Sequence, residues 1–173
     1  QASAMIAEYL GADLGKVSNE LDKLIISLPE NTQITPDHIE RNIGISKEYN
    51  VFELQNALGE KNVLKANRII NYFGANPGSN PITRVISSLY YYFEKLLVYQ
   101  FLEDKSKNAV ASKLGINPYF VQSYVTAAKN YSIKKLVEII AILREYDMKS
   151  KGVGNVSSDP GDLQREMIYK ILH

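Results

Sequence analysis

The sequence contains no cysteine among its 173 residues. Disulfides, thiolate catalysis and cysteine-bound zinc are therefore excluded, and the composition fits a reducing compartment such as the cytoplasm. Histidine is scarce: His38 and His173 lie far apart in the sequence. No spacing of His, Asp and Glu has the convergence that a metal site needs. We therefore expect no bound metal, and structural or solvated roles for both histidines.

Charge of one sign and long apolar runs are missing too. Twenty basic residues face nineteen acidic ones, a net charge of +1, so the surface as a whole carries no strong field for nucleic acid or membrane. No apolar run reaches the roughly 18 residues of a membrane span. The chain starts QASAMIAEYL, without an initiator methionine or a basic leader, so we expect a fragment or a processed chain.

Catalytic motifs are equally hard to find. Gly74 and Gly78 lie in a turn that no lysine–serine pair follows, unlike a phosphate-binding loop. No serine occupies a nucleophile elbow. The acidic residues are spread over polar helix faces. We expect no catalytic residue and no cofactor, and therefore no enzyme within this chain by itself.

Helical periodicity is what the sequence does contain. From Leu14 to Leu28, for example, apolar residues recur at steps of three and four. No segment alternates with period two, so we predict an all-α fold without strands. About ten helices are expected, over residues 1–11, 13–28, 35–43, 50–59, 63–73, 81–105, 108–114, 118–129, 132–149 and 160–172. A polar linker at 45–50 and flexible loops at 74–80 and 150–159 separate them. Asp13 and Ser132 are expected to cap the helices that follow them, and Asp159 with Pro160 to open the last helix. The inner face of the helix over 132–149 is expected to contain Ile133, Leu136, Val137, Ile140, Leu143 and Tyr146.

The stretch from Tyr49 to Phe73 organises this pattern. Asn50 is a good N-cap, with Glu53 three residues later as in a capping box. Gly59 is expected to end the first of two short helices, because glycine tolerates the left-handed conformation. The three short helices before this pair can bury one another only marginally, so they form a small module that should pack on something else. The longest helix, from Pro81, should be the centre of a second unit.

Four tyrosines on that longest helix are candidates for a subunit interface: Tyr90, Tyr91, Tyr92 and Tyr99. Three adjacent positions cover nearly the whole circumference of a helix, so at least one ring must face away from the core. Tyrosine is enriched in protein interfaces because its ring buries area while its hydroxyl stays paired. Base stacking and ordinary core packing remain alternatives.

Two basic features are candidates for DNA contact. Lys149 and Lys151 precede a glycine-containing loop and could touch a phosphate backbone, although lysines at a helix end also complement the helix dipole. Residues 109–130 have the form of a helix-turn-helix, whose second helix would enter the major groove. The favoured interpretation of 109–130 is a helical corner that packs Leu114, Ile116, Phe120 and Val121, because the outward positions are only weakly basic. These positions are Gln122, Ser123, Thr126, Lys129 and Asn130.

Three stretches, in order along the chain, resemble one known family. They are NELDKL at 19–24 with Ile34, Thr35 and Ile39; VFEL at 51–54 with ALGEKN at 57–62; and ASKLGINPYFV at 111–121 with Tyr131, Ser132, Leu136, Asp147 and Lys149. In their order and spacing they resemble the C-terminal half of the delta subunit of the bacterial DNA polymerase III clamp loader. Glu94, where a basic residue is common, and the glycine- and serine-rich loop 150–159 depart from that family.

The resemblance implies two domains. Residues 1–46 would be the helical lid of an AAA+-like module, and residues 47–173 a helical-bundle collar that joins like domains in a five-membered ring. The partners would be the motor subunits and delta-prime, with DNA reached through the assembled complex. The domain that holds the clamp-opening element would be missing, so the chain should not bind the sliding clamp by itself.

We therefore expect a non-catalytic scaffold that assembles the cytoplasmic clamp loader of the DNA polymerase III holoenzyme, a DNA-directed DNA polymerase complex, without cofactor, metal or membrane. The alternative is a DNA-binding regulator that uses the helix-turn-helix at 109–130. The charge of the surface around residues 118–130 discriminates the two, because a groove reader needs a basic stripe there.

Overall fold

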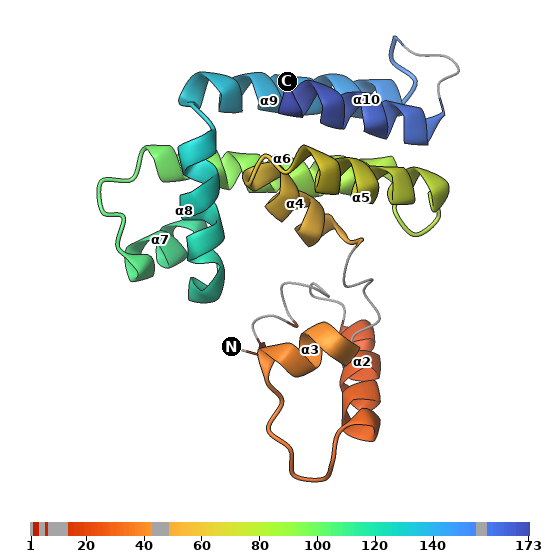
Figure 1. Cartoon of the computed structure of the whole chain (residues 1–173), viewed down its shortest axis with the longest axis vertical. Coiled ribbons are helices and arrows are strands. Elements are labelled where there is room, and N and C mark those ends of the chain that lie inside the picture. The colour runs from red at the N-terminus through yellow and green to blue at the C-terminus, as the bar shows by residue number, and fades with distance from the viewer. Residues whose placement is uncertain (1, 4–5, 7–13, 43–48, 155–158) are drawn as a thin grey trace. The chain divides into compact units, whose positions relative to one another are not determined.

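The structure of the chain is a computed structural model that describes residues 2–3, 6, 14–42, 49–154 and 159–173. The chain divides into two compact units, residues 1–47 and 48–173. The described residues form helices and loops without any strand, which confirms the all-α prediction (Figure 1). Several predicted features lie outside the described residues: most of the helix over 1–11, the cap at Asp13, the third helix's end at Ile43 and Gly44, the linker at 45–48 and loop residues 155–158.

The first unit contains two helices within its described part, α2 (Leu14–Ser27) and α3 (Pro36–Asn42). Leu24 of α2 and Ile39 of α3 are buried. The predicted apolar stripe of α2 is only partly used, because Leu14 and Ile25 are 82% and 67% exposed. Among the described helices, α2 packs against α3, and residues at the edges of its apolar stripe stay exposed.

The second unit begins with the predicted helix pair, α4 (Val51–Gly59) and α5 (Val63–Ala75). Asn50 caps α4 as predicted: its side-chain oxygen accepts from the backbone N–H groups of Phe52 and Glu53, both at 2.9 Å. This helix ends at Gly59 as predicted, but the left-handed conformation expected for Gly59 was wrong. The left-handed residue of this turn is Lys61, at φ 54°, and the C-cap of α4 is Glu60 in a right-handed conformation.

Gly59 is required for packing instead. A Cβ atom built on Gly59 would overlap the hydroxyl of Tyr92 and come within 3.1 Å of the Ala127 Cβ. The same holds where α5 crosses the last helix: a Cβ on Gly161 would lie 2.9 Å from the Cα of Gly74. Both glycines of the helix pair therefore mark close contacts with helices that come later in the chain.

The longest helix, α6 (Ile82–Gln100), is central as predicted. It packs against α4 and against α7 (Lys107–Leu114), α8 (Val121–Asn130), α9 (Ile133–Ser150) and α10 (Pro160–Leu172). The predicted end near Lys105 was wrong, because the chain turns at Phe101, whose side chain is 68% exposed. After Leu102, residues 103–107 are all polar, so none of them could extend the buried stripe of α6.

The turn between α7 and α8 differs slightly from the prediction. Gly115 is left-handed at φ 60°, as expected for a helix end. Pro118 opens a 3-10 turn, Pro118–Phe120, and α8 begins only at Val121. Leu114, Ile116 and Val121 are buried and Phe120 is half-buried, as expected for a helical corner.

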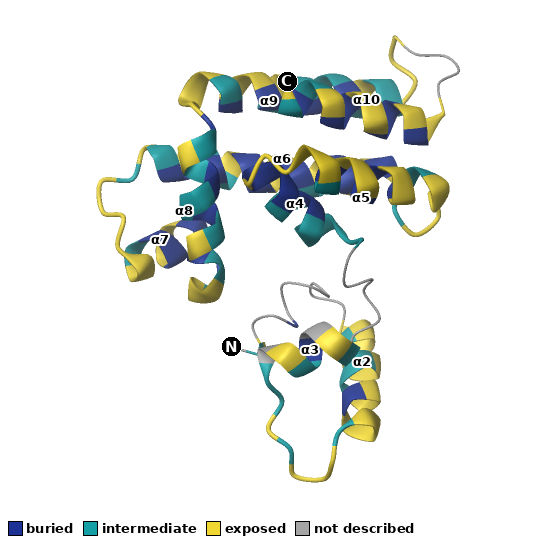
Figure 2. Ribbon diagram, in the orientation of Figure 1, coloured by how far each residue is buried: buried dark blue, intermediate teal, exposed yellow. Residues whose placement is uncertain are grey.

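Helices α9 and α10 lie side by side over α5 and α6 (Figure 1). Their predicted caps are present: Ser132 accepts from the Lys135 N–H at 3.2 Å, and Asp159 from the Gly161 N–H at 2.8 Å. The inner face of α9 was predicted only in part. Ile133 and Val137 are 43% and 54% exposed, whereas Ile139 is buried with Leu136, Leu143 and Tyr146. Contact with both α6 and α10 sets this face. Figure 2 shows buried residues along the facing sides of α4 to α10.

The close contact at Gly59 gives a stability prediction. Gly59→Ala should lower the free energy of unfolding by about 1–3 kcal/mol, the usual cost of forcing an extra methyl into a packed site. Urea unfolding followed by circular dichroism measures it. Gly78→Ala is the matched control, because a Cβ there meets nothing within 4 Å and the expected change is within about 0.5 kcal/mol. Equal effects of the two substitutions would contradict the packing role of Gly59.

Candidate functional site

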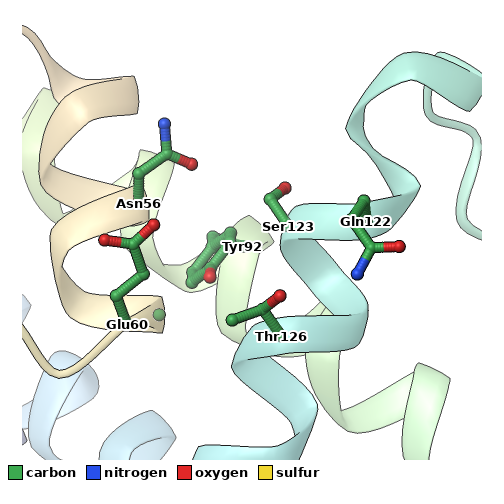
Figure 3. A pocket seen from close by; sticks show the side chains of 7 residues that line it. Asn56, Glu60, Tyr92, Gln122, Ser123 and Thr126 are labelled. Carbon is green, nitrogen blue, oxygen red and sulfur yellow. The ribbon is translucent and has the colours of Figure 1, made fainter.

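A polar pocket lies between α4 and α8, with α6 as its floor (Figure 3). Its volume is about 200 Å³. Gly59 and Tyr92 are buried at the bottom, and Glu60 and Gln122 are exposed at the rim. The lining residues are Asn56, Gly59 and Glu60 of α4 and its cap, Tyr92 of α6, and Gln122, Ser123 and Thr126 of α8.

Hydrogen bonds hold the end of α4 beside this pocket. The Tyr131 hydroxyl donates to the carbonyl of Leu58 at 2.6 Å, and the Asn130 amide donates to the carbonyl of Gly59 at 2.8 Å. Burial raises the pKa of Tyr131 to about 12. The pKa of Tyr92 is raised further, mainly by burial, with smaller contributions from Tyr124, Tyr131 and the Glu60 carboxylate. Both hydroxyls therefore stay protonated and act as hydrogen-bonding groups.

This geometry argues against the helix-turn-helix alternative. Three of the five side chains expected to read bases, Gln122, Ser123 and Thr126, line the pocket and face α4 (Figure 3). A fourth, Asn130, donates to the Gly59 carbonyl. Within residues 118–130 the only basic residue is Lys129. The segment therefore lacks the basic stripe and the open helix face that groove binding requires.

The four candidate interface tyrosines separate into two classes. Tyr92 and Tyr99 are 4% and 6% exposed and belong to the core of the second unit, so their assignment to an interface is corrected. The reason is the helical position: both lie on the face of α6 that meets the neighbouring helices. Tyr90 and Tyr91 are 40% and 62% exposed, with their rings edge-to-face at 5.8 Å. For these two, the interface stays a prediction.

The two candidate DNA contacts carry carboxylate partners. Lys149 pairs with Glu145 and Lys151 with Asp147, each at 2.7 Å. The Lys149 ammonium also lies 4.7 Å from the centre of the Tyr146 ring, which Lys170 approaches to 5.1 Å. A hydrogen bond from Lys149 is the main cause that lowers the pKa of Glu145, and Lys170 adds to it. Phosphate binding by either lysine would compete with these ion pairs, and DNA contact stays a prediction.

Both histidines of the chain are among the described residues. No group of three His, Asp or Glu side chains that could hold a metal occurs among them. His38 accepts from the Thr35 N–H at 3.4 Å, and the His173 ring stacks on Tyr169 with centres 4.3 Å apart. None of the helices in the searched part of the chain is long and apolar enough to cross a membrane.

Comparison with protein families decides the family. Residues 48–158 match the family described as "DNA polymerase III delta subunit, C-terminal domain". The chain belongs to this family. The resemblance to the clamp-loader delta subunit is thereby confirmed for its C-terminal part. The match begins where the second unit begins and takes in α4 to α9 of this delta C-terminal domain.

The fold is also found among solved structures. The chain is similar to the "Bacillus subtilis DNA clamp loader delta protein (YqeN)", with a TM-score of 0.66 at 20% sequence identity. The similarity covers 92% of this chain and 46% of the Bacillus subtilis protein, so this chain spans about half the length of that protein. A sequence search of curated proteins found no match.

Sequence reasoning missed the α4–α8 pocket of this delta C-terminal domain. It treated Gly59 as a helix end and Gln122, Ser123 and Thr126 as an outward face. The sequence did contain an indication of this pocket. Ser123 and Thr126 lie one turn apart on the same face of α8, and their side chains are too small and polar to pack in a core. Only the position of α4 reveals what this face meets.

The ion pair at the end of α9 gives a prediction about pKa. Replacing Lys149 with Met should raise the pKa of Glu145 toward its ordinary value, though not fully, because Lys170 remains 3.4 Å away. The pairing stabilises the folded state above the ordinary carboxyl pKa, and this contribution disappears as the pH falls through the lowered one. A carbon-13 NMR titration of the side-chain carboxyls measures the shift. Lys151→Met is the control, since Lys151 contacts Asp147 instead, and an equal rise at Glu145 in both variants would refute the assignment.

Proposed function

We propose that this chain is a scaffold component of a bacterial clamp loader, with residues 1–46 as a lid domain and residues 47–173 as a collar domain. The observation that carries the proposal is the match to the delta C-terminal family over 48–158, which falls within the second compact unit. Its partners would be the other clamp-loader subunits, and DNA would be reached only through the assembly. A role in replication would place it in the cytoplasm.

The character of the second unit supports a binding role. Its core is continuous from α4 to α10. Large apolar side chains nevertheless remain exposed on α6, α9 and α10, including Tyr91 at 62%, Val137 at 54% and Tyr169 at 60%. A non-catalytic role in the polymerase holoenzyme is consistent with the side chains present, because no cluster of His, Asp and Glu that could hold a metal occurs in the described part of the chain. A collar domain needs open surfaces rather than reactive groups.

The first test is assembly. The chain, mixed with the motor and delta-prime subunits from the same source, should co-migrate with them as one defined complex in sedimentation velocity. A distinct peak of the chain alone at every mixing ratio, together with salt-sensitive binding of duplex DNA by the chain, would overturn the scaffold and restore a DNA-binding function.

The second test addresses the tyrosine surface. Tyr91→Ala should weaken assembly about fivefold or more, as expected for an interface aromatic whose loss costs upward of about 1 kcal/mol. Titration in the same sedimentation experiment gives the affinity. Tyr119→Ala is the matched control and should leave the affinity unchanged, because Tyr119 is 55% exposed but lies in the 3-10 turn, outside the three helices with the exposed apolar side chains. Wild-type affinity for Tyr91→Ala would remove Tyr91 from the interface.

A further inference from the structure

The α4–α8 pocket has the chemistry of a cation site. Its lining contains one carboxylate, two amides and three hydroxyls, and it contains no Lys, Arg or His. The carboxylate is Glu60 at the rim, and the Tyr92 hydroxyl is at the floor. An anion would meet Glu60 without any compensating charge, so the lining disfavours carboxylate and phosphate ligands.

The end of α4 adds to this negative field. Glu60 is the C-cap of α4, where the aligned peptide dipoles leave about half a negative charge. The last turn of α4 contains no basic residue. Lys61, the next residue, lies over the ring of Tyr131 at 5.1 Å. Glu60 forms no ion pair within the described part of the chain, so its charge remains available to a ligand.

The shape of the pocket selects among cations. Its volume of about 200 Å³ is several times the ~30 Å³ that a water molecule occupies in the liquid, so more than a small ion fits. Polar side chains stand on opposite walls, on α4 and its cap and on α8, and both walls include residues with oxygen atoms that can accept hydrogen bonds (Figure 3). A planar guanidinium offers five N–H donors in fixed directions and is weakly hydrated, whereas an ammonium is a compact and strongly hydrated charge. Acceptors on two facing walls therefore suit a guanidinium better.

We propose that this pocket binds the guanidinium group of an arginine side chain from a partner protein, with Glu60 as the counter-charge and the polar side chains of α8 as further acceptors. An arginine on a protein surface reaches such a site because its long stem carries the planar group past the rim formed by Glu60 and Gln122. That the arginine belongs to a clamp-loader subunit rests on the proposed function; guanidinium binding by the pocket does not.

Methylguanidinium tests the pocket itself. In proton–nitrogen NMR spectra of the full chain at constant ionic strength, it should shift the amide signals of Gly59, Glu60, Ser123 and Thr126 in a saturable manner. Methylammonium should shift them with weaker affinity. Glu60→Gln should weaken methylguanidinium binding about two- to fivefold, the range for an exposed ion pair. Glu138→Gln, an exposed carboxylate of α9 outside the pocket, should bind as the wild type does.

Three results would overturn the site: shifts that do not saturate, equal affinity for the two cations, or equal effects of Glu60→Gln and Glu138→Gln. A separate experiment tests whether the arginine comes from a clamp-loader subunit. In it, the chain with Glu60→Gln is mixed with the motor and delta-prime subunits. Weaker assembly than with Glu138→Gln supports a clamp-loader arginine, and identical assembly rejects it. If the wild-type chain forms no complex, the proposed function fails, while the methylguanidinium result still decides the pocket.

Discussion

The close contact between Gly59 and Tyr92 is the constraint on which the second unit depends. Without a side chain at Gly59, the end of α4 sits directly against the Tyr92 hydroxyl of α6. Hydrogen bonds from Tyr131 and Asn130 to the last carbonyls of α4 hold α8 and the start of α9 at the same place. One missing methyl group thus determines how three helices meet, and the polar pocket exists because they meet in this way.

This arrangement also determines which tyrosines remain for partners. Tyr92 packs edge-to-face on Phe93 and against Tyr124, and Phe93 in turn packs on Tyr131. These rings fill the space between α6 and α8, which turns the adjacent positions 90 and 91 outward. The core and the candidate binding surface are therefore two sides of one helix, and a change in the packing of Tyr92 would move Tyr91 as well.

Local signals made most of the helices predictable. Caps at Asn50, Ser132 and Asp159 depend on a few neighbouring residues, and the structure confirms all three. The predictions that were wrong concerned residues whose environment is set by segments far away in the sequence. The buried face of α9 is set by α6 and α10, and the role of Gly59 by Tyr92, which lies 33 positions later. Periodicity shows that a helix has an apolar side, yet it does not show where two other helices will cover that side. The family was recognisable from the order of its motifs, whereas the pocket was not, because its walls are far apart in the sequence.

The distribution of charge separates the two kinds of site considered for this chain. Lys149 and Lys151 already form ion pairs with Glu145 and Asp147 of α9, so a phosphate would have to displace these carboxylates. Exposed ion pairs of this kind stabilise a protein by about 1 kcal/mol or less. Phosphates would replace these carboxylates only where several phosphates act together, as on a duplex held by a whole assembly. Glu60 lies at the negative end of a helix and has no such ion-pair partner in the part of the chain that the structure describes. A single arginine is enough to pair with the Glu60 carboxylate. The charges of this domain therefore favour binding of a protein side chain at Glu60 over binding of phosphate at Lys149 and Lys151.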